Sequence, residues 1–332
     1  MRFMNSSNMP RAIRIHENGG PEVLRLETVE REPLGTRQVR IRQTAIGVNF
    51  IDTYDRSGLY PVSLPSGIGR EAAGVVIEAG QAVKALREGD RVAYAGNSPG
   101  AYCDERVMDA ARVVKLPDSV TDRVASASML KGLTAWFLLR RCHRIRRNEP
   151  VLLHAAAGGV GLIALQWAVA LGAKVIAVVG SDEKAALVRE HGAAEVIVSS
   201  RENVVERVRL ITKNKGVPVV YDGAGKDTFL ASLDCLAPLG LMVSYGNASG
   251  AVPPFSPLEL SRRGSLFLTR PTLFHYIAKA SALARGAREL FEVIGTGRVK
   301  VRIGQTWPLA ESAEAHRALE ARRTTGSTLL IP

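Results

Sequence analysis

The sequence predicts an α/β protein that combines a doubly wound parallel sheet with a second, mainly β region. Two observations lead to this prediction. Between about residues 151 and 244, short apolar strands alternate with segments of helical length, which is typical of βαβ units in a parallel sheet. Between residues 11 and 117, short segments alternate apolar and polar residues and are separated by Gly, Pro and Asp turns, which is typical of half-buried strands.

The mainly β region opens the chain. Its expected strands are RAIRI (11–15), VLRLETV (23–29), VRIRQTAI (39–46), AAGVVIEAG (72–80), DRVAYAG (90–96) and RVVKLP (112–117). The patterned sequence begins only at Arg11, so Met9 is a candidate start and residues 1–8 are expected to form a ragged extension.

The parallel sheet is expected to contain five strands. They are VLLHA (151–155), KVIAVVG (174–180), AEVIV (194–198), VPVVYD (217–222) and GLMVSYG (240–246). Val and Ile occupy both alternate positions of these strands, as expected when helices cover both faces of the sheet. Beyond them a helix is expected at about 275–294, and the final segment, which ends in STLLIP, is long enough to return to the first region.

Composition indicates an ordinary globular protein without membrane spans. The 332 residues suit about two domains of roughly 150 residues each. No apolar run approaches the roughly 18 residues of a membrane span, and the N-terminus lacks the apolar block of a secretory signal, so a cytoplasmic location is expected. The cysteines, Cys103, Cys142 and Cys235, form no Cys-x-x-Cys pair and have no His at ligand spacing, so neither a disulfide framework nor a metal site is predicted.

The chain carries a formal net charge of +12, which favours phosphate-bearing partners such as nucleic acid, anionic lipid or a nucleotide cofactor. Five arginines crowd into LLRRCHRIRRNE (138–149), directly after the apolar segment LTAWFLL. Cations favour the carbonyl end of a helix, so we interpret this cluster as a solvated helix end in preference to a nucleic-acid patch.

The stretch HAAAGGVGLIALQWA (154–168) matches the dinucleotide fingerprint G-x-G-x-x-G, with Ala156, Gly158 and Gly161 at the three glycine positions. These positions provide a tight turn, close approach of bare backbone to a pyrophosphate, and close packing of helix on strand. Gly159 and Val160 lie between them and open the helix, whose positive end favours an anion. Small residues after a strand also serve packing alone, but the βαβ context favours nucleotide binding.

The end of the second strand predicts which dinucleotide is bound. About 20 residues beyond the loop, an NAD-binding protein carries a carboxylate for the ribose hydroxyls. Here Gly180 and Ser181 supply none, and Lys184 can neutralise a 2′-phosphate. Asp182 and Glu183 oppose this reading, but both suit the first turn of the next helix. The sequence therefore favours NADPH over NADH.

Several motifs together carry a family resemblance that runs from about Met9 to Pro332. They are NFIDTYDRSGLYP, LKGLTA, HAAAGGVGLIALQWA, VVYDGAGKDTF, GLMVSYGNASGAV, LTRPTL and TTGSTLLIP. In this combination the chain resembles the NADPH-dependent quinone oxidoreductases, the zeta-crystallin-like branch of the medium-chain dehydrogenase/reductase superfamily.

The resemblance implies a GroES-like catalytic domain (1–132), a Rossmann NADPH-binding domain (133–271) and a C-terminal segment (272–332) that returns to the catalytic domain. It also implies a cofactor held in the cleft between the domains and a homodimeric or tetrameric assembly. Zinc-containing relatives carry a catalytic cysteine and a four-cysteine site, and neither pattern is present here. Arg70 stands where alcohol dehydrogenases have a zinc-binding histidine, so no metal is expected.

The resemblance also assigns residues. Asn49, Tyr54 and Tyr60 would line the nicotinamide end and the substrate pocket. The implied cofactor contacts outside the fingerprint are Asn49, Thr134, Gly246, Asn247 and Arg270, with Lys184 and Arg322 at the 2′-phosphate. Ser199 stands where close relatives place a tyrosine against the adenine or phosphate, and Arg201 or Arg323 are candidates to compensate for it.

Three functions remain open at this point. The first is NADPH-dependent quinone reduction by hydride transfer, in which Tyr54 either donates a hydrogen bond to the developing hydroquinone or, as we favour, only walls the pocket with Tyr60. The second is reduction of α,β-unsaturated carbonyls on the same fold. The third is RNA binding through the basic surface. Asp52 is expected either to orient its neighbours or to pair with Arg56, and His154 to be a packed, hydrogen-bonded strand residue.

Overall fold

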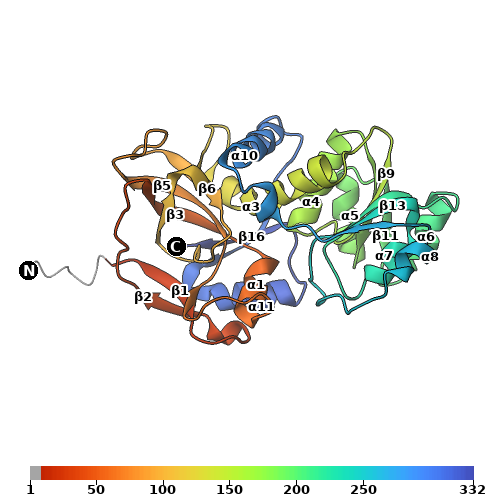
Figure 1. The fold of residues 1–332 in the computed structure, drawn as a ribbon, viewed down its shortest axis with the longest axis horizontal. Helices are drawn as coiled ribbons and strands as arrows, with labels where there is room; N and C mark the ends of the chain where they lie inside the picture. Colours follow the sequence, from red (N-terminus) through yellow and green to blue (C-terminus); the bar gives the residue numbers. More distant parts are fainter. Residues whose placement is uncertain (1–8) are drawn as a thin grey trace, which may run out of the picture. The chain divides into compact units, whose positions relative to one another are not determined.

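The computed structural model describes residues 9–332, and the expected extension at residues 1–8 lies outside the described residues. The described chain forms two compact units (Figure 1). Unit 1 contains the residues up to 130 together with 278–291 and 301–332, and unit 2 contains 131–277 and 292–300. Unit 1 is therefore assembled from segments that are far apart in the sequence, whereas only residues 278–291 separate the two segments of unit 2.

Unit 1 contains a three-stranded sheet of order β2-β1-β4 and a seven-stranded sheet of order β15-β16-β3-β5-β6-β8, with β7 paired to β3. The strands are β1 (Arg11–Ile15), β2 (Arg25–Thr28), β3 (Gln38–Val48), β4 (Ser66–Gly67), β5 (Glu71–Ala79), β6 (Arg91–Ala95), β7 (Glu105–Asp109), β8 (Val114–Lys115), β15 (Ile303–Pro308) and β16 (Ser327–Ile331). The helices are α1 (Phe50–Ser57), α2 (Asp122–Ser126), α11 (Ser312–Glu320) and most of α10 (Ala280–Gly295).

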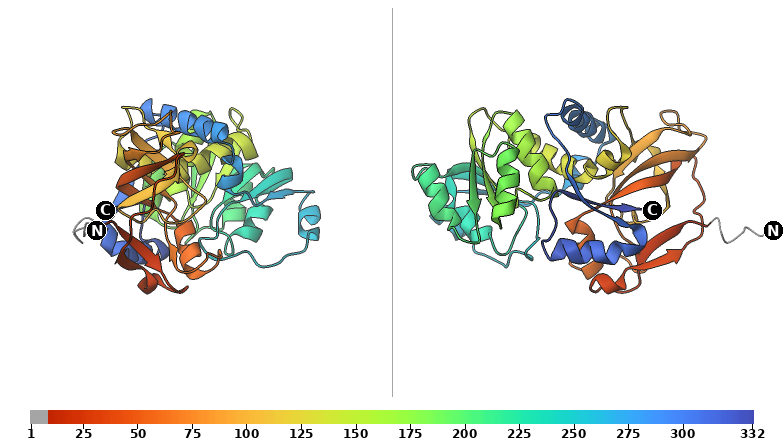
Figure 2. Two further views of the ribbon diagram at one scale, coloured as in Figure 1. Left: turned by 60° about the vertical axis from the view of Figure 1, so that its left-hand side comes forward. Right: turned by 180° about the vertical axis from the view of Figure 1, so that it is seen from behind.

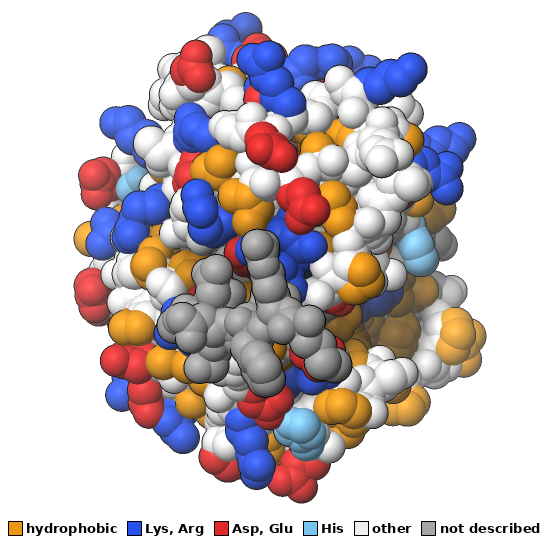
Figure 3. Space-filling model, turned by 90° about the vertical axis from the view of Figure 1, so that its left-hand side faces the viewer, with side chains coloured by type: hydrophobic (Ala, Val, Ile, Leu, Met, Phe, Trp, Pro, Cys, Tyr) orange, Lys and Arg blue, Asp and Glu red, His pale blue; other side chains and the backbone are white. Residues whose placement is uncertain are grey.

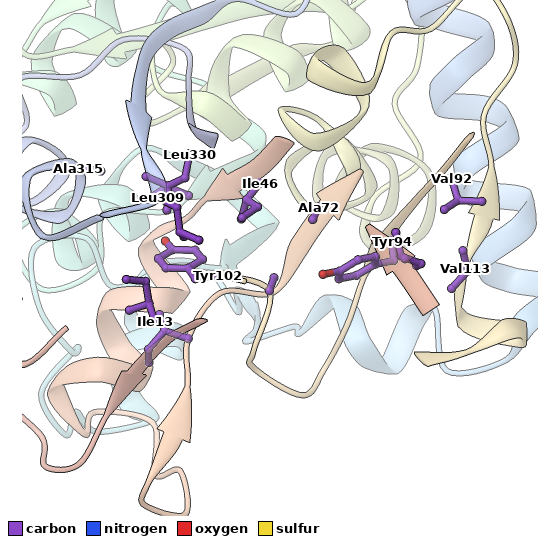
Figure 4. Close-up of a cluster of buried hydrophobic side chains, with 14 of the residues drawn as sticks. Ile13, Ile46, Ala72, Val92, Tyr94, Tyr102, Val113, Leu309, Ala315 and Leu330 are labelled. Atoms are coloured by element: carbon purple, nitrogen blue, oxygen red, sulfur yellow. The ribbon is translucent and has the colours of Figure 1, made fainter. Parts of the chain in front are cut away.

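The C-terminal segment completes unit 1. Strand β16 pairs antiparallel with β3, with Leu330 opposite Ile46, and Figure 2 shows this dark-blue strand beside the orange-red strands of the N-terminal part. Figure 4 shows the resulting core, in which Leu309 and Leu330 pack with Ile46 and Tyr102. The core of unit 1 is thus shared between the two ends of the chain.

Unit 2 confirms the predicted doubly wound parallel sheet. Its order is β11-β10-β9-β12-β13-β14, and every pairing in it is parallel. The strands are β9 (Pro150–Leu153), β10 (Lys174–Val179), β11 (Glu195–Val198), β12 (Val217–Asp222), β13 (Leu236–Ser244) and β14 (Phe267–Thr269). The sequence predicted five of these six strands and missed β14, because three half-buried or exposed residues carry no clear alternation.

The helices of unit 2 cover both faces of this sheet. They are α3 (Met129–Phe137, which begins in unit 1), α4 (Gly159–Ala170), α5 (Asp182–Glu190), α6 (Val204–Ile211), α7 (Phe229–Asp234), α8 (Leu258–Arg262) and α9 (Leu273–Tyr276). Right-handed crossovers place α4 and α5 on one face and α6 to α8 on the other (Figure 1). The strand order reverses between β9 and β12, and such a switch point is where open α/β sheets bind ligands.

Two expectations about helices need correction or detail. The helix expected at about 275–294 begins only at Ala280, because the short helix α9 ends first at its C-cap residue Ile277, whose backbone (φ −109°, ψ 18°) leaves the helical conformation. The arginine cluster does follow a helix: Arg140 and Arg141 lie exposed in a π-helical turn (Leu138–Cys142) after α3. Within residues 9–332, no helix is long and apolar enough to span a membrane.

Candidate active site

The glycine loop joins β9 to α4. The buried Ala156 donates its N–H to the Val178 carbonyl of β10 (3.2 Å), and the Gly158 N–H closes a turn on the Ala155 carbonyl (2.9 Å). A Cβ on Gly161 would lie 2.2 Å from the Ala155 oxygen, so only glycine allows α4 to approach this turn. A Cβ on Gly158 would meet that oxygen at 3.2 Å, a contact that a small shift relieves.

The first turn of α4 is suited to an anion. Its N-cap residue is Gly158, which has no side chain to cap the helix, whereas Ser181 and Asn203 cap α5 and α6. The first N–H groups of a helix need partners, and they carry its positive end. The residues present therefore fit the pyrophosphate of a dinucleotide.

The ends of β10 and β11 bring together the residues predicted near the adenosine. The Ser199 hydroxyl donates to the Val179 carbonyl (3.2 Å), next to Gly180, and Ser181 accepts the Lys184 N–H (3.4 Å). Asp182 lies in the first turn of α5, as expected, and pairs with Arg201 (2.7 Å). The positive charge of Arg201 therefore compensates the negative charge of Asp182, which would otherwise repel a phosphate group.

A third group lies at the ends of β12, β13 and β14. A Cβ on Gly246 would lie 2.3 Å from the Gly223 oxygen, and Asn247 lies beside Gly225. Arg270 follows β14 and donates to the Ser244 carbonyl (3.1 Å). Because carboxyl ends of parallel strands share one edge, the structure brings these residues to the same edge of unit 2 as the glycine loop and Lys184.

A buried network that the sequence analysis did not identify braces this edge at the switch point. Asp222 accepts from the N–H groups of Ala224 (2.8 Å) and Gly225 (3.2 Å) and from the Ser232 hydroxyl (2.8 Å). Ser232 also bonds His154 Nε2 (3.0 Å). Burial lowers the pKa of His154, so this residue is the packed, hydrogen-bonded group that the sequence indicated. In the sequence, the only sign of this network is the Asp-Gly pair in VVYDGAG, which is typical of a turn.

The residues predicted for the substrate pocket lie in unit 1. Asn49 precedes α1, and the buried Tyr54 meets the half-buried Tyr60 edge to face, with ring centroids 5.2 Å apart. Thr134 is buried on α3 in unit 2. Arg322 is exposed after α11 in unit 1.

Two buried carboxylates hold Asn49. Asp52 Oδ2 accepts the Asn49 backbone N–H (2.8 Å), and Glu71 Oε1 accepts from Asn49 Nδ2 (2.8 Å). Asp52 also accepts from the Tyr102 hydroxyl (2.9 Å), and burial raises the pKa of Asp52 to about 7. Of the two roles expected for Asp52, the structure shows the orienting one.

Arginines near this site have other partners. Arg56 pairs with Glu320 (2.6 Å) and bonds His316 Nδ1 (3.0 Å). Arg70, at the position of the zinc-binding histidine, forms a two-pronged ion pair with the buried Asp55 (2.7 and 2.8 Å). Among residues 9–332, no three His, Cys, Asp or Glu side chains are grouped closely enough to hold a metal ion.

The charge on the surface is mixed where Figure 3 shows it. On that face, Lys and Arg side chains are interspersed with Asp, Glu and apolar side chains.

Comparisons with known proteins give two matching family models. Residues 35–118 match the alcohol dehydrogenase GroES-like domain, and residues 159–292 match the model described as zinc-binding dehydrogenase. The chain is 51% identical to a quinone oxidoreductase of Pseudomonas aeruginosa, over 98% of this chain and 100% of that protein. It is 44% identical to a 2-haloacrylate reductase of Burkholderia, over 96% of this chain and 98% of that protein.

Solved structures agree with these matches. The crystal structure of an Escherichia coli quinone oxidoreductase complexed with NADPH superposes with a TM-score of 0.95 at 48% identity, covering 97% of this chain and 100% of that chain.

Proposed function

The chain belongs to the quinone oxidoreductase family of the medium-chain dehydrogenase/reductase superfamily, and from this we propose that it reduces quinones with NADPH. The observation that carries the proposal is full-length similarity at about half identity, joined to a glycine loop whose helix presents an uncapped N-terminus. We assign cofactor binding to residues 133–271 and the acceptor pocket to residues 1–132 with 272–332. We place the enzyme in the cytoplasm.

The balanced reaction is NADPH, a quinone and a proton giving NADP⁺ and a hydroquinone. NADPH, when bound, supplies the hydride. The protein binds the pyrophosphate at Gly158 and the α4 N-terminus, and it positions the acceptor beside Asn49, Tyr54 and Tyr60. A quinone is a strong electrophile, so positioning in a dry pocket needs little acid–base assistance from the protein.

Lys184 tests the preference for NADPH. The ammonium group faces a 2′-phosphate only in NADPH, so Lys184→Ala should weaken NADPH binding about tenfold or more and leave NADH binding unchanged within about twofold. Fluorescence titration with each cofactor measures both values. Arg189→Ala removes the same charge from an exposed position of α5 and should change neither. Equal weakening of both cofactors by Lys184→Ala would remove Lys184 from the phosphate site.

Reduction of α,β-unsaturated carbonyls is the second candidate, because a 2-haloacrylate reductase is 44% identical to the chain. An enone needs hydride at its β carbon and a proton at its α carbon, whereas a quinone takes the hydride without such a donor. Steady-state kinetics with NADPH on matched quinones and enones separate the two. A higher kcat/KM for the enones would reverse our assignment.

We also propose that the protein is a homodimer that pairs through β14. This strand is the edge of the sheet in unit 2, and its Phe267 is 60% exposed, with Leu258 also 60% exposed and Leu239 67%. An open edge with an exposed aromatic side chain is suited to pairing with a second copy.

RNA remains an alternative partner. An RNA gel shift that weakens with salt and is displaced by NADPH would support it, and binding that is insensitive to salt would exclude the electrostatic model.

A further inference from the structure

Glu71 is a buried carboxylate outside the residues assigned to cofactor or acceptor. It opens β5, is fully buried, and uses both oxygens. Oε1 accepts from Asn49 Nδ2 (2.8 Å), and Oε2 accepts from the Leu130 backbone N–H (2.6 Å).

The first of these bonds fixes which way the Asn49 amide faces. The oxygen and nitrogen of an amide have nearly the same shape, so packing alone does not distinguish the two orientations. A carboxylate only accepts hydrogen bonds, so the NH₂ group of Asn49 must face Glu71. Asp52 holds the backbone N–H of the same residue. Buried acids therefore hold both the backbone N–H and the side-chain NH₂ group of Asn49, and the side chain also takes part in the capping box of α1 with Asp52.

The second bond anchors the start of α3. Leu130 is the second residue of that helix. N–H groups in the first turn of a helix have no partner within the helix, and this end of the helix dipole is positive, so a carboxylate is favourable there. Thr134, a predicted cofactor contact, follows one turn later. One carboxylate thus joins Asn49 to the helix that bears Thr134.

The carboxylate has little room to move. Gly47 stands opposite Glu71 in the register of β3 and β5, and a Cβ there would lie 2.3 Å from Glu71 Oε1 and from the Ser126 carbonyl oxygen. The glycine leaves the space that Glu71 fills.

We propose that Glu71 is a positioning residue for the reaction, because it holds the Asn49 amide in the one orientation that serves the bound cofactor and acceptor. This role rests on the proposed function of Asn49. If Glu71 only stabilised the fold, replacing it would have the same effect on activity with or without Asn49. If Glu71 orients Asn49, the effect disappears once Asn49 is removed, so the two roles can be separated.

Glu71→Gln is the informative variant because Gln has nearly the same shape as Glu but replaces one carboxylate oxygen by an NH₂ group. The Leu130 N–H cannot turn, so the Gln oxygen stays with it and the Gln NH₂ group faces Asn49. Asn49 then has to flip its amide to accept. The anchor of α3 survives, while the hydrogen-bonding pattern of Asn49 is inverted.

The test is a double-mutant cycle read by NADPH titration and by kcat/KM with 1,4-benzoquinone. Glu71→Gln should lower kcat/KM about tenfold, the effect of one misplaced hydrogen bond. In the Asn49→Ala background the same substitution should change it less than about twofold. The thermal midpoint of Glu71→Gln should stay within about 5 °C of the parent, since the packing is kept.

Glu78→Gln is the matched control, since Glu78 lies on the same strand with a half-exposed side chain paired to Arg40. It should leave binding and turnover unchanged. An equal loss in both backgrounds, no loss in either, or unfolding of Glu71→Gln in both would overturn the positioning role. If quinone turnover is absent from the parent but Glu71→Gln weakens NADPH binding in the parent and not in the Asn49→Ala background, the quinone proposal fails and the role of Glu71 stands.

Discussion

His316 has a tautomer that its neighbours determine. Arg56 can only donate, so His316 Nδ1 must accept its hydrogen bond and the ring hydrogen sits on Nε2. Nε2 then donates to the Tyr102 oxygen (3.1 Å), and the Tyr102 hydroxyl donates to Asp52. The chain of donors runs in one direction, from Arg56 to the carboxylate that holds Asn49.

This arrangement gives a pH-dependent prediction. Burial and the nearby Arg56 charge lower the pKa of His316 to about 3 from the ordinary 6.5. Between these values the unfolded chain binds a proton that the folded chain does not, so this group's contribution to stability is full above pH 6.5 and is lost as the pH falls toward 3. His316→Gln should therefore cost more unfolding free energy at pH 7 than at pH 4. Urea unfolding at the two pH values measures the difference, and a cost independent of pH would contradict the assignment.

Some residues of the candidate site were readable from the sequence and others were not. Gly158 and Gly161 sit at fixed spacing in one turn, so local pattern was enough. The pairing of Arg201 with Asp182 joins two strand ends 19 residues apart, and the contact between Asn49 and Glu71 joins the residue that follows β3 to the start of β5. Such contacts depend on strand order, which no local spacing encodes.

At the scale of elements, the two glycines of the turn between β9 and α4 have different tasks: Gly161 allows close packing and Gly158 allows approach of the pyrophosphate. Gly161→Ala should destabilise the fold by about 2 kcal/mol or more, because the new methyl group meets backbone. Gly158→Ala should cost less stability but weaken NADPH binding by at least about tenfold, because its Cβ would occupy the approach to the pyrophosphate. Denaturant unfolding and cofactor titration of both variants check the contrast. Equal effects on stability would mean that Gly158 also serves packing.

The predicted elements were most accurate where periodicity was long. Strand β3 was expected, and so was the α4 helix, but β3 is buried at most positions and alternates only over residues 41–45. Strands β4 and β7 were missed, as was β14, because each is short or half exposed and is defined by its partner. The pairing of β7 with β3 follows from tertiary packing, which overrides the weak local signal.

At the scale of the whole molecule, the edge strand β14 gives a test of assembly. Phe267→Lys should convert the proposed dimer to a monomer in sedimentation velocity, because it places a charge on the pairing edge. Leu210→Lys alters a residue of α6 that is 68% exposed, against 60% for Phe267, and should leave the mass unchanged. A parent protein that sediments as a monomer, or a Phe267→Lys variant that remains dimeric, would exclude this interface.

The shared core of unit 1 also sets an order of events during synthesis. Residues 131–277 leave the ribosome as one continuous segment and can form their parallel sheet early. Strand β3 has to wait for residues 327–331, which are made after every segment of unit 2, before Leu330 covers Ile46. We expect the N-terminal sheet to keep an exposed apolar edge until residues 327–331 have been made, which makes it the part of the nascent chain that chaperones need to protect.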